Sequence, residues 1–213
     1  MQHIGLFSKH LILDDNILNL IIEHLIIYWG VSLILLKYAG VKFSISFKTT
    51  SLVLFNQCIV GYASLKCFKI LPIISNNTLY TELINYIILY YYLQCIWFYF
   101  VHRILHQRFF WRNIHYIHHM YIDTMPYAAV YCHPLEHFVL NLMSIFIGPI
   151  LFPSNMVVTK LWFHICTTNT VISHFSRLRG STPRGHDLHH LLHRYNYGTG
   201  CFMDIIFGTY MKS

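Results

Sequence analysis

The chain has 213 residues, of which 55% are hydrophobic and only 11% are charged; this suits a single domain, residues 1–213, that is too apolar for an ordinary soluble protein. Its 15 Lys and Arg residues outnumber its 8 Asp and Glu residues, but they lie mainly between apolar segments, as membrane-flanking charges do. The basic excess therefore does not indicate nucleic-acid binding.

Two apolar segments occupy the N-terminal third. Ile17–Tyr38 is long enough to cross about 30 Å of hydrocarbon as a helix. Glu23 and His24 interrupt it near one end, either as a functional site within the membrane or, in the commoner case, as residues of the interface or the bundle interior. Ser51–Leu65 is short for a full span, which favours a tilted or half-buried helix.

The third apolar segment, Leu83–Val101, is rich in Tyr, Ile and Leu and leads directly into His102. Aromatic residues of this kind favour the membrane interface, so His102 is expected at the membrane boundary. Basic residues follow within the next ten positions, and by the positive-inside rule they assign this face to the cytosol: Arg103, Arg108 and Arg112.

Two further apolar segments precede the C-terminal region. Phe138–Ile147 is expected to stop at Gly148-Pro149, and Met156–Ser173 is expected to end at His174. If Phe138–Phe152 and Met156–Ser173 pass in and back, the C-terminal region returns to the side that carries His102.

The C-terminal region is expected to form one more helix. Thr182-Pro183 is a suitable start for it, and Asn196-Tyr197-Gly198 is a suitable end. The sequence as a whole thus predicts an all-α integral membrane protein with about four transmembrane or membrane-embedded helices and a cytosolic histidine-rich helical cap.

Three histidine arrays are the most informative pattern in the chain. The arrays are one HxxxH and two HxxHH motifs, formed by His102 and His106, by His115, His118 and His119, and by His186, His189 and His190. Residues three and four apart share one face of a helix, whereas adjacent residues point about 100° apart. An adjacent pair could therefore serve two metal ions with one imidazole each. A lone histidine is more often a core or surface residue, but repeated ligand spacing favours metal binding.

These motifs resemble those of the fatty acid hydroxylase/sterol desaturase superfamily of membrane di-iron oxygenases. The resemblance covers residues 95–210 and looks closest to the C4-methylsterol monooxygenases. It is carried by HRILH, IHYIHH, AVYCHPLEH (Ala129–His137) and HDLHH, with a weaker match at Asn56-Gln57. The chain departs from the pattern at His174-Phe175-Ser176, where the superfamily often has His-Ser-Gly and a longer loop before the last motif.

The resemblance implies a set of iron ligands and a set of residues that orient them. The ligands would be His102, His106, His115, His118, His119, His174, His186, His189 and His190. His133 is a candidate tenth ligand, with a helix-start role beside Pro134 as the alternative, and His137, His164 and His193 are weaker candidates. Orientation of the imidazoles would fall to Glu136, Asp187, Asn196 and Asp204, which otherwise serve as helix caps and surface polar groups.

The resemblance also implies a function. It is that of a monooxygenase that uses O₂ and two iron ions to oxidise an unactivated C–H bond of a lipid, first of all a sterol C4-methyl group. Electrons would come from NADH or NADPH through cytochrome b5 or a reductase, in the endoplasmic reticulum membrane.

Other functions stay open at this point. A fatty-acyl or sphingolipid hydroxylase, or a desaturase, would use the same metals. A membrane metal transporter is the alternative outside enzymes, although the histidine arrays lie outside the apolar segments. A catalytically inactive scaffold is a third reading, against which three complete motifs argue.

Overall fold

The computed structural model describes residues 2–68, 79–175 and 185–212, and all regular structure in these ranges is helical. The N-terminal half consists of long helices. They are α1 (Gln2–Tyr38), then a continuous unit of α2 (Phe47–Leu54), the π-helical η1 (Phe55–Val60) and α3 (Gly61–Phe68), and then α4 (Leu79–Leu105).

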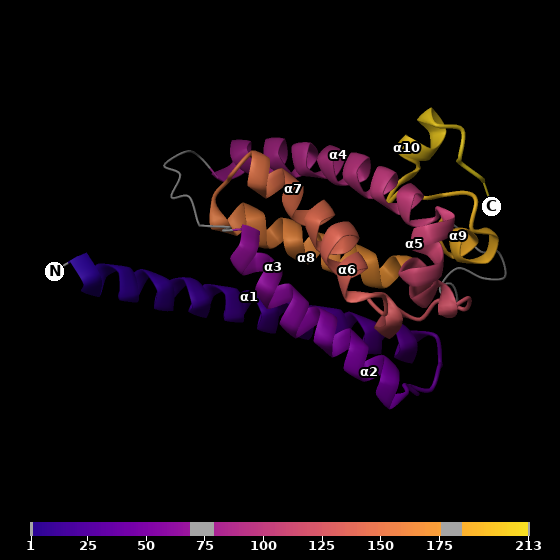
Figure 1. Ribbon diagram of the computed structural model, residues 1–213, viewed down its shortest axis with the longest axis horizontal. Coiled ribbons are helices and arrows are strands. Elements are labelled where there is room, and N and C mark those ends of the chain that lie inside the picture. Colours follow the sequence, from indigo (N-terminus) through magenta and orange to yellow (C-terminus); the bar gives the residue numbers. More distant parts are fainter. Residues whose placement is uncertain (1, 69–78, 176–184, 213) are drawn as a thin grey trace.

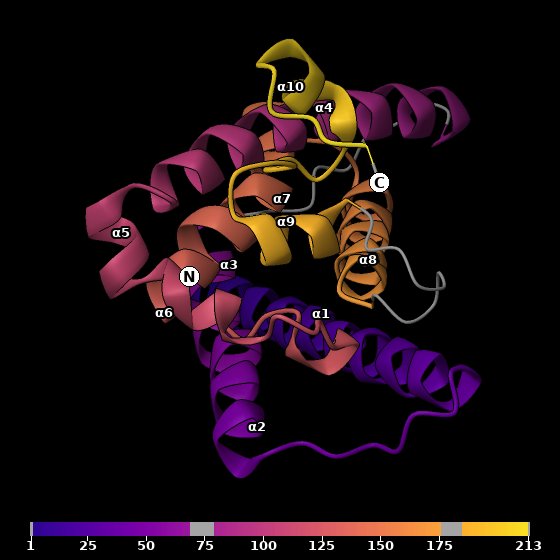
Figure 2. The same ribbon diagram turned by 90° about the vertical axis from the view of Figure 1, so that its right-hand side faces the viewer.

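The second half alternates short helices with two longer ones. In chain order these are α5 (Arg108–Asn113), η2 (His115–Met120), η3 (Pro126–Ala128), α6 (Pro134–Glu136), the π-helical η4 (His137–Leu142), α7 (Met143–Leu151), α8 (Met156–Ser173), α9 (His186–Leu192) and α10 (Cys201–Ile206). α4, α7 and α8 pack together, α1 lies along α8, and α5, α9 and α10 gather at one end of the bundle (Figures 1 and 2).

Among the residues that the structure describes, four helical stretches are long and apolar enough to cross a membrane, so the predicted all-α membrane architecture is confirmed. They are Asp15–Tyr38, Phe47–Phe68, Leu83–Leu105 and Pro134–Leu151. The second stretch has 22 residues, more than the predicted run Ser51–Leu65. The helix begins earlier than the apolar run because Ser46 caps it: the Ser46 hydroxyl accepts a hydrogen bond from the Thr49 amide.

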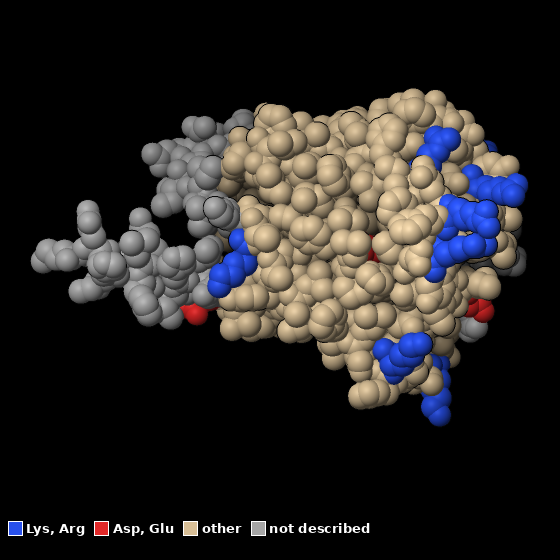
Figure 3. Space-filling model, in the orientation of Figure 1, with Lys and Arg blue, Asp and Glu red and all other residues tan. Residues whose placement is uncertain are grey.

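The outer surface of these helices is apolar. On α1 and α4, large aliphatic side chains are largely exposed, for example Ile26 (67%) and Ile84 (62%). Figure 3 shows Lys and Arg side chains gathered at the end of the molecule that carries α5 and α9, with an almost uncharged surface behind them. Lipid rather than water is the solvent that suits such a surface.

The prediction that a helix stops at Gly148-Pro149 was wrong, because α7 continues to Leu151 with Pro149 inside it. Proline has no N–H, so the carbonyl four residues earlier loses its helical partner. That carbonyl belongs to Ile145, and it accepts a hydrogen bond from Trp162 Nε1 at 2.8 Å. A side chain on α8 thus replaces the missing donor and allows the helix to pass through Pro149.

α8 has the predicted bounds, whereas α9 ends earlier than expected. Asn155 caps α8, its Oδ1 accepting from the Val157 amide at 2.7 Å. α9 ends at Leu192, because His193 adopts the left-handed conformation with φ 60°. The predicted start of this helix, Thr182-Pro183, lies outside the described residues.

Glu23 and His24 form polar contacts between α1 and α8. Glu23 pairs with Lys160 at 2.7 Å and with His164 at 3.0 Å, both on α8. The Nδ1 of His24 lies 3.0 Å from Thr167 Oγ1. These contacts pair the polar groups of α1 with those of α8. They favour the structural role for Glu23 and His24 over a functional site within the membrane.

Candidate metal centre

The histidine arrays meet at one end of the bundle, although they are up to 88 positions apart in the chain. Their described elements converge there: the last turn of α4, the 3₁₀ turn η2, the end of α8 and α9. The imidazole nitrogens form two groups, within each of which the candidate ligand atoms lie within 4.8 Å of one another.

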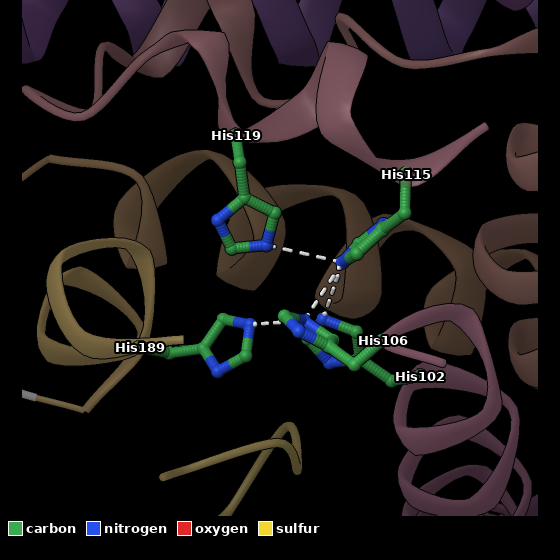
Figure 4. A group of neighbouring side chains, drawn as sticks. All are labelled: His102, His106, His115, His119 and His189. Atoms are coloured by element: carbon green, nitrogen blue, oxygen red, sulfur yellow. Dashed lines mark hydrogen bonds between the residues drawn. The ribbon is translucent and has the colours of Figure 1, made fainter. Parts of the chain in front are cut away.

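The first cluster consists of His102, His106, His115, His119 and His189. Their rings point inward from three separate segments (Figure 4). The Nε2 atom of His115 lies 3.1 Å from that of His102, 3.0 Å from that of His106 and 3.0 Å from that of His119. The Nε2 atoms of His106 and His189 are 3.0 Å apart.

The second cluster consists of His118, His174, His186 and His190. Their Nε2 atoms form a closed ring of short contacts. The separations are 3.4 Å between His118 and His174, 3.0 Å between His174 and His186, 3.1 Å between His186 and His190, and 3.2 Å between His190 and His118. The two clusters adjoin, since the ring centroids of His119 and His190 are 4.5 Å apart.

Adjacent histidines divide between the clusters. His119 and His189 belong to the first, whereas His118 and His190 belong to the second. This geometry matches the expectation that neighbouring imidazoles face two different centres. His115–His119 lie on a 3₁₀ turn rather than on the α-helix assumed from the spacing.

The short Nε2 contacts fit a shared cation better than hydrogen bonds. A neutral imidazole has at most one donor and one acceptor nitrogen, yet His115 Nε2 has three Nε2 neighbours within 3.1 Å. Nitrogen ligands about 2.1 Å from one centre and at right angles to one another are about 3.0 Å apart. The donor sets therefore fit a two-metal site.

Burial favours the neutral form of the clustered imidazoles. Burial, reinforced by the neighbouring rings, lowers the pKa of His106 to about 2, and burial lowers the pKa of His174 to about 4. Burial likewise holds the pKa of His118 and of His186 well below the usual value. The neutral form is the one that ligates metal.

Several Nδ1 atoms are held by acceptors, which turns the corresponding Nε2 atoms toward the centres. His115 Nδ1 donates to Glu136 Oε1 at 2.8 Å, and both side chains are buried. Backbone carbonyls accept from three others, in the pairs His102–Tyr197 at 2.7 Å, His189–Tyr195 at 2.7 Å and His174–Thr170 at 2.8 Å. Such partners fix the tautomer and the ring orientation of a ligand.

Glu136, one of the four expected orienting residues, contacts the clustered ring of His115 directly. Asp204 acts indirectly on His102. Its carboxylate accepts from the amides of Tyr197 and Gly198 and so holds in place the Tyr197 carbonyl that binds His102 Nδ1. Asp187 accepts from Thr124 Oγ1. Asn196 bonds the backbone of Gly185 and Met211, the role of a loop clamp.

The structure does not bring the remaining candidate histidines into either cluster. His133 caps α6, its Nδ1 accepting from the Leu135 amide at 3.1 Å. His137 contacts Asn141, and His164 pairs with Glu23. His193 lies edge-on to His119, with ring centroids 4.7 Å apart, but it lies outside the ligand groups.

A cavity of about 250 Å³ adjoins the clusters. Four imidazoles reach it, those of His102, His118, His174 and His186. Its walls combine apolar side chains such as Phe98, Leu140, Ile145, Ile172 and Phe175 with polar ones from the membrane helices. Binding cavities for small molecules have this mixed character.

Comparison with known proteins identifies the family. The model of the family described as fatty acid hydroxylase matches residues 87–209, more than half of the chain. The chain belongs to the fatty acid hydroxylase family. Both histidine clusters lie entirely within the segment that the family model matches.

Relatives in this family carry different names. The chain is 31% identical over 171 residues to human fatty acid hydroxylase domain-containing protein 2. That alignment covers 74% of this chain and 50% of the human protein. The chain is 30% identical over 183 residues to methylsterol monooxygenase 1 of Gallus gallus, covering 68% and 60%. Fatty acid hydroxylase ahd1 of Mycosarcoma maydis is 34% identical over 122 residues, covering 55% and 31%.

The chain thus spans about half the length of the curated relatives that it matches. No solved structure matches it.

In this member of the fatty acid hydroxylase family, the sequence did not reveal the carbonyls of Tyr195 and Tyr197 or the cavity residue Gln94. Main-chain acceptors carry no residue-type signal, and a glutamine in an apolar segment gives none that separates a cavity wall from a helix contact.

Proposed function

We propose that the chain is a membrane-bound di-iron oxygenase that uses O₂ to hydroxylate an unactivated C–H bond of a lipid. One observation carries the proposal: nine imidazoles converge through Nε2 on two adjoining centres, beside a cavity inside an apolar bundle. The nine ligands proposed from the resemblance are the nine members of the two clusters, without His133.

The chemistry of the proposed reaction favours iron. The first cluster offers five nitrogens, more than the four ligands of a closed zinc site. Zinc also has no redox role, whereas bound iron would activate O₂, so that one oxygen atom enters the C–H bond and the other leaves as water. Soluble di-iron bundles use Glu and Glu-x-x-His ligands, and an all-imidazole set is the alternative in this carboxylate-poor chain.

The chain's own residues would supply position and exclusion of water. Glu136 and the carbonyls of Tyr197, Tyr195 and Thr170 hold imidazole N–H groups, so that the opposite nitrogens face the centres. The apolar cavity wall would hold the lipid beside the imidazoles and keep water from the reacting carbon.

A sterol, oxidised at a C4-methyl group, is our first choice of substrate, supported by the similarity to methylsterol monooxygenase 1 over 68% of the chain. A fatty-acyl or sphingolipid hydroxylase, or a desaturase, is the alternative, supported by the similarity to ahd1. NADH or NADPH would supply electrons through cytochrome b5 or a reductase. The Lys- and Arg-rich end of the bundle supports a cytosolic orientation of the centre in the endoplasmic reticulum membrane.

The experiment is lipid analysis of cells with and without the chain, combined with metal analysis of the purified protein. We expect two iron ions per chain and an oxygenated lipid that incorporates oxygen from ¹⁸O₂. The His118→Ala variant should lose the product, whereas His133→Asn, which keeps a helix-capping side chain outside the clusters, should retain it. Full activity of His118→Ala would contradict the proposal.

A further inference from the structure

Gln94 is an amide placed in the wall of the cavity, within the third membrane-spanning stretch. Its side chain is only 9% exposed. It belongs to α4, eight residues before His102, which corresponds to about 12 Å along the helix. It therefore lines the part of the cavity that extends from the imidazoles into the apolar bundle.

One end of the Gln94 amide is paired and the other is free. Its Oε1 accepts a weak hydrogen bond from the Cys166 thiol at 3.7 Å. Within the part of the chain that the structure describes, the NH₂ group has no acceptor. A buried donor without an acceptor is costly, and the cost is larger in an apolar surrounding. A ligand in the cavity would supply that acceptor.

Other cavity residues add to this polar wall. Asn169 on α8 also lines the cavity, and its side chain forms no hydrogen bond with any other described residue. Asn141 on η4 directs its side-chain NH₂ group to Cys132 and His137, and its side-chain Oδ1 has no donor among the described residues. The amides therefore come from three helices around one space that is otherwise lined by Phe98, Leu140 and Ile145.

We propose that the free NH₂ group of Gln94 donates a hydrogen bond to an oxygen atom of the lipid, so that the cavity selects lipids bearing a hydroxyl or carbonyl group over pure hydrocarbon chains. This assignment rests on the proposed function, because it takes the cavity as the lipid site. A plain alkyl segment in the same place would leave the amide unpaired, whereas an oxygenated lipid pairs it. Gln94 is thus a specificity-determining residue rather than a catalytic one.

The test measures binding rather than turnover. The full chain is placed in phosphatidylcholine nanodiscs, and dissociation constants are determined for two matched pairs, cholestanol with cholestane and hexadecanol with hexadecane. We expect at least one alcohol to bind about tenfold more tightly than its hydrocarbon, which corresponds to about 1.4 kcal/mol. In Gln94→Leu the preference should fall to about twofold or less, through weaker binding of the alcohol.

Gln57→Leu is the matched control. Gln57 is also a buried amide of the bundle, but it contacts Trp29 and His24 and does not line the cavity. This variant should keep the preference of the wild type even where it loses stability. Metal content and the unfolding temperature of each variant show whether its fold is intact.

The inference would be overturned if the wild-type chain bound alcohol and hydrocarbon equally, or bound neither pair. It would also be overturned if folded Gln94→Leu kept the preference of the wild type. Neither result concerns iron content or oxygenated product, so failure of this inference and failure of the oxygenase proposal are distinguishable. Conversely, a chain without iron or product could still show the preference.

Discussion

His118 and His119 are consecutive residues whose imidazoles serve different clusters. The two rings lie at 83° to one another. The Nε2 of His119 is 3.0 Å from that of His115, whereas the Nε2 of His118 is 3.2 Å from that of His190. A single peptide unit therefore joins the two proposed metal centres, and substitutions at these positions can address one centre at a time.

The first prediction concerns metal stoichiometry. His119→Ala leaves four nitrogens in the first cluster, and His118→Ala leaves three in the second. We expect each variant to lose affinity for one iron ion and to retain the other, with His118→Ala the more severe because its cluster begins with fewer ligands. Quantification of iron in the purified proteins by mass spectrometry checks this. Loss of both ions from His119→Ala with an intact fold would indicate that the centres do not load separately.

The second prediction concerns Glu136, which is buried and accepts from His115 Nδ1 at 2.8 Å. Glu136→Gln keeps an acceptor oxygen of the same size, whereas Glu136→Leu removes it and leaves a buried N–H unpaired. We expect Glu136→Leu to weaken metal binding at the first cluster by about 10- to 100-fold and Glu136→Gln to have a smaller effect. Competition with a chelator measures both affinities.

The comparison between the two variants is itself the control. Equal losses in Glu136→Gln and Glu136→Leu would show that the negative charge, not the hydrogen bond, stabilises the site. No loss in Glu136→Leu would remove Glu136 from the orientation of His115.

Local spacing explains which parts of the site were visible in the sequence. HxxHH places its members by turn geometry alone, so the division of His189 and His190 between two centres follows from neighbouring positions. Glu136 is 21 positions from His115, and its candidacy rested on the family resemblance, because no local rule pairs residues at that distance. The contact between His102 and the Tyr197 carbonyl could not be predicted either, because the two residues are 95 positions apart in the chain.

The fold shows the same limit at Pro149. Local rules end a helix at a Gly-Pro pair, and that prediction failed because Trp162, on another helix, binds the carbonyl that the proline leaves free. Hydrophobic length, by contrast, predicted α8 to the residue and the approximate extent of the membrane-spanning stretches of α1 and α4, although α1 itself begins at Gln2. Segment hydrophobicity is a local property, whereas compensation of a helix defect depends on the tertiary fold.

The third prediction concerns Asp204, whose carboxylate holds the loop that orients His102. It accepts from the Tyr197 and Gly198 amides at 2.8 Å each and from Thr209 Oγ1 at 2.7 Å. Asp204→Asn turns an NH₂ group toward one of these donors, so we expect the Tyr197 carbonyl to shift and iron affinity at the first cluster to fall by about tenfold or more. The second cluster should keep its iron.

Asp123→Asn is the matched control for Asp204→Asn, because Asp123 is exposed. It should leave iron content and product formation unchanged. A uniform loss of both ions in Asp204→Asn, together with a lowered unfolding temperature, would assign Asp204 to global stability instead of to the orientation of His102.

The fourth prediction uses two glycines that sit in membrane-spanning helices and differ in their surroundings. A Cβ on Gly148 would lie 2.8 Å from Tyr90 Cγ and 3.1 Å from Tyr90 Cα, whereas a Cβ on Gly30 would meet nothing within 4 Å. Gly148 is thus the point at which α7 approaches the backbone of α4, and Tyr90 is fully buried there. Close approach of helix backbones is a common use of small residues in membranes.

Gly148→Ala is expected to push α4 and α7 apart and to destabilise the fold by about 1–3 kcal/mol. Gly30→Ala should instead be neutral or stabilising by up to about 1 kcal/mol, because alanine loses less conformational freedom in a helix. Thermal unfolding of both variants in the same detergent gives the comparison. Equal stability of the two variants would mean that the helices are not packed this closely. Because α4 also carries His102 and Gln94, a shifted α4 in Gly148→Ala should lower iron affinity as well. Gly30→Ala should lack this effect.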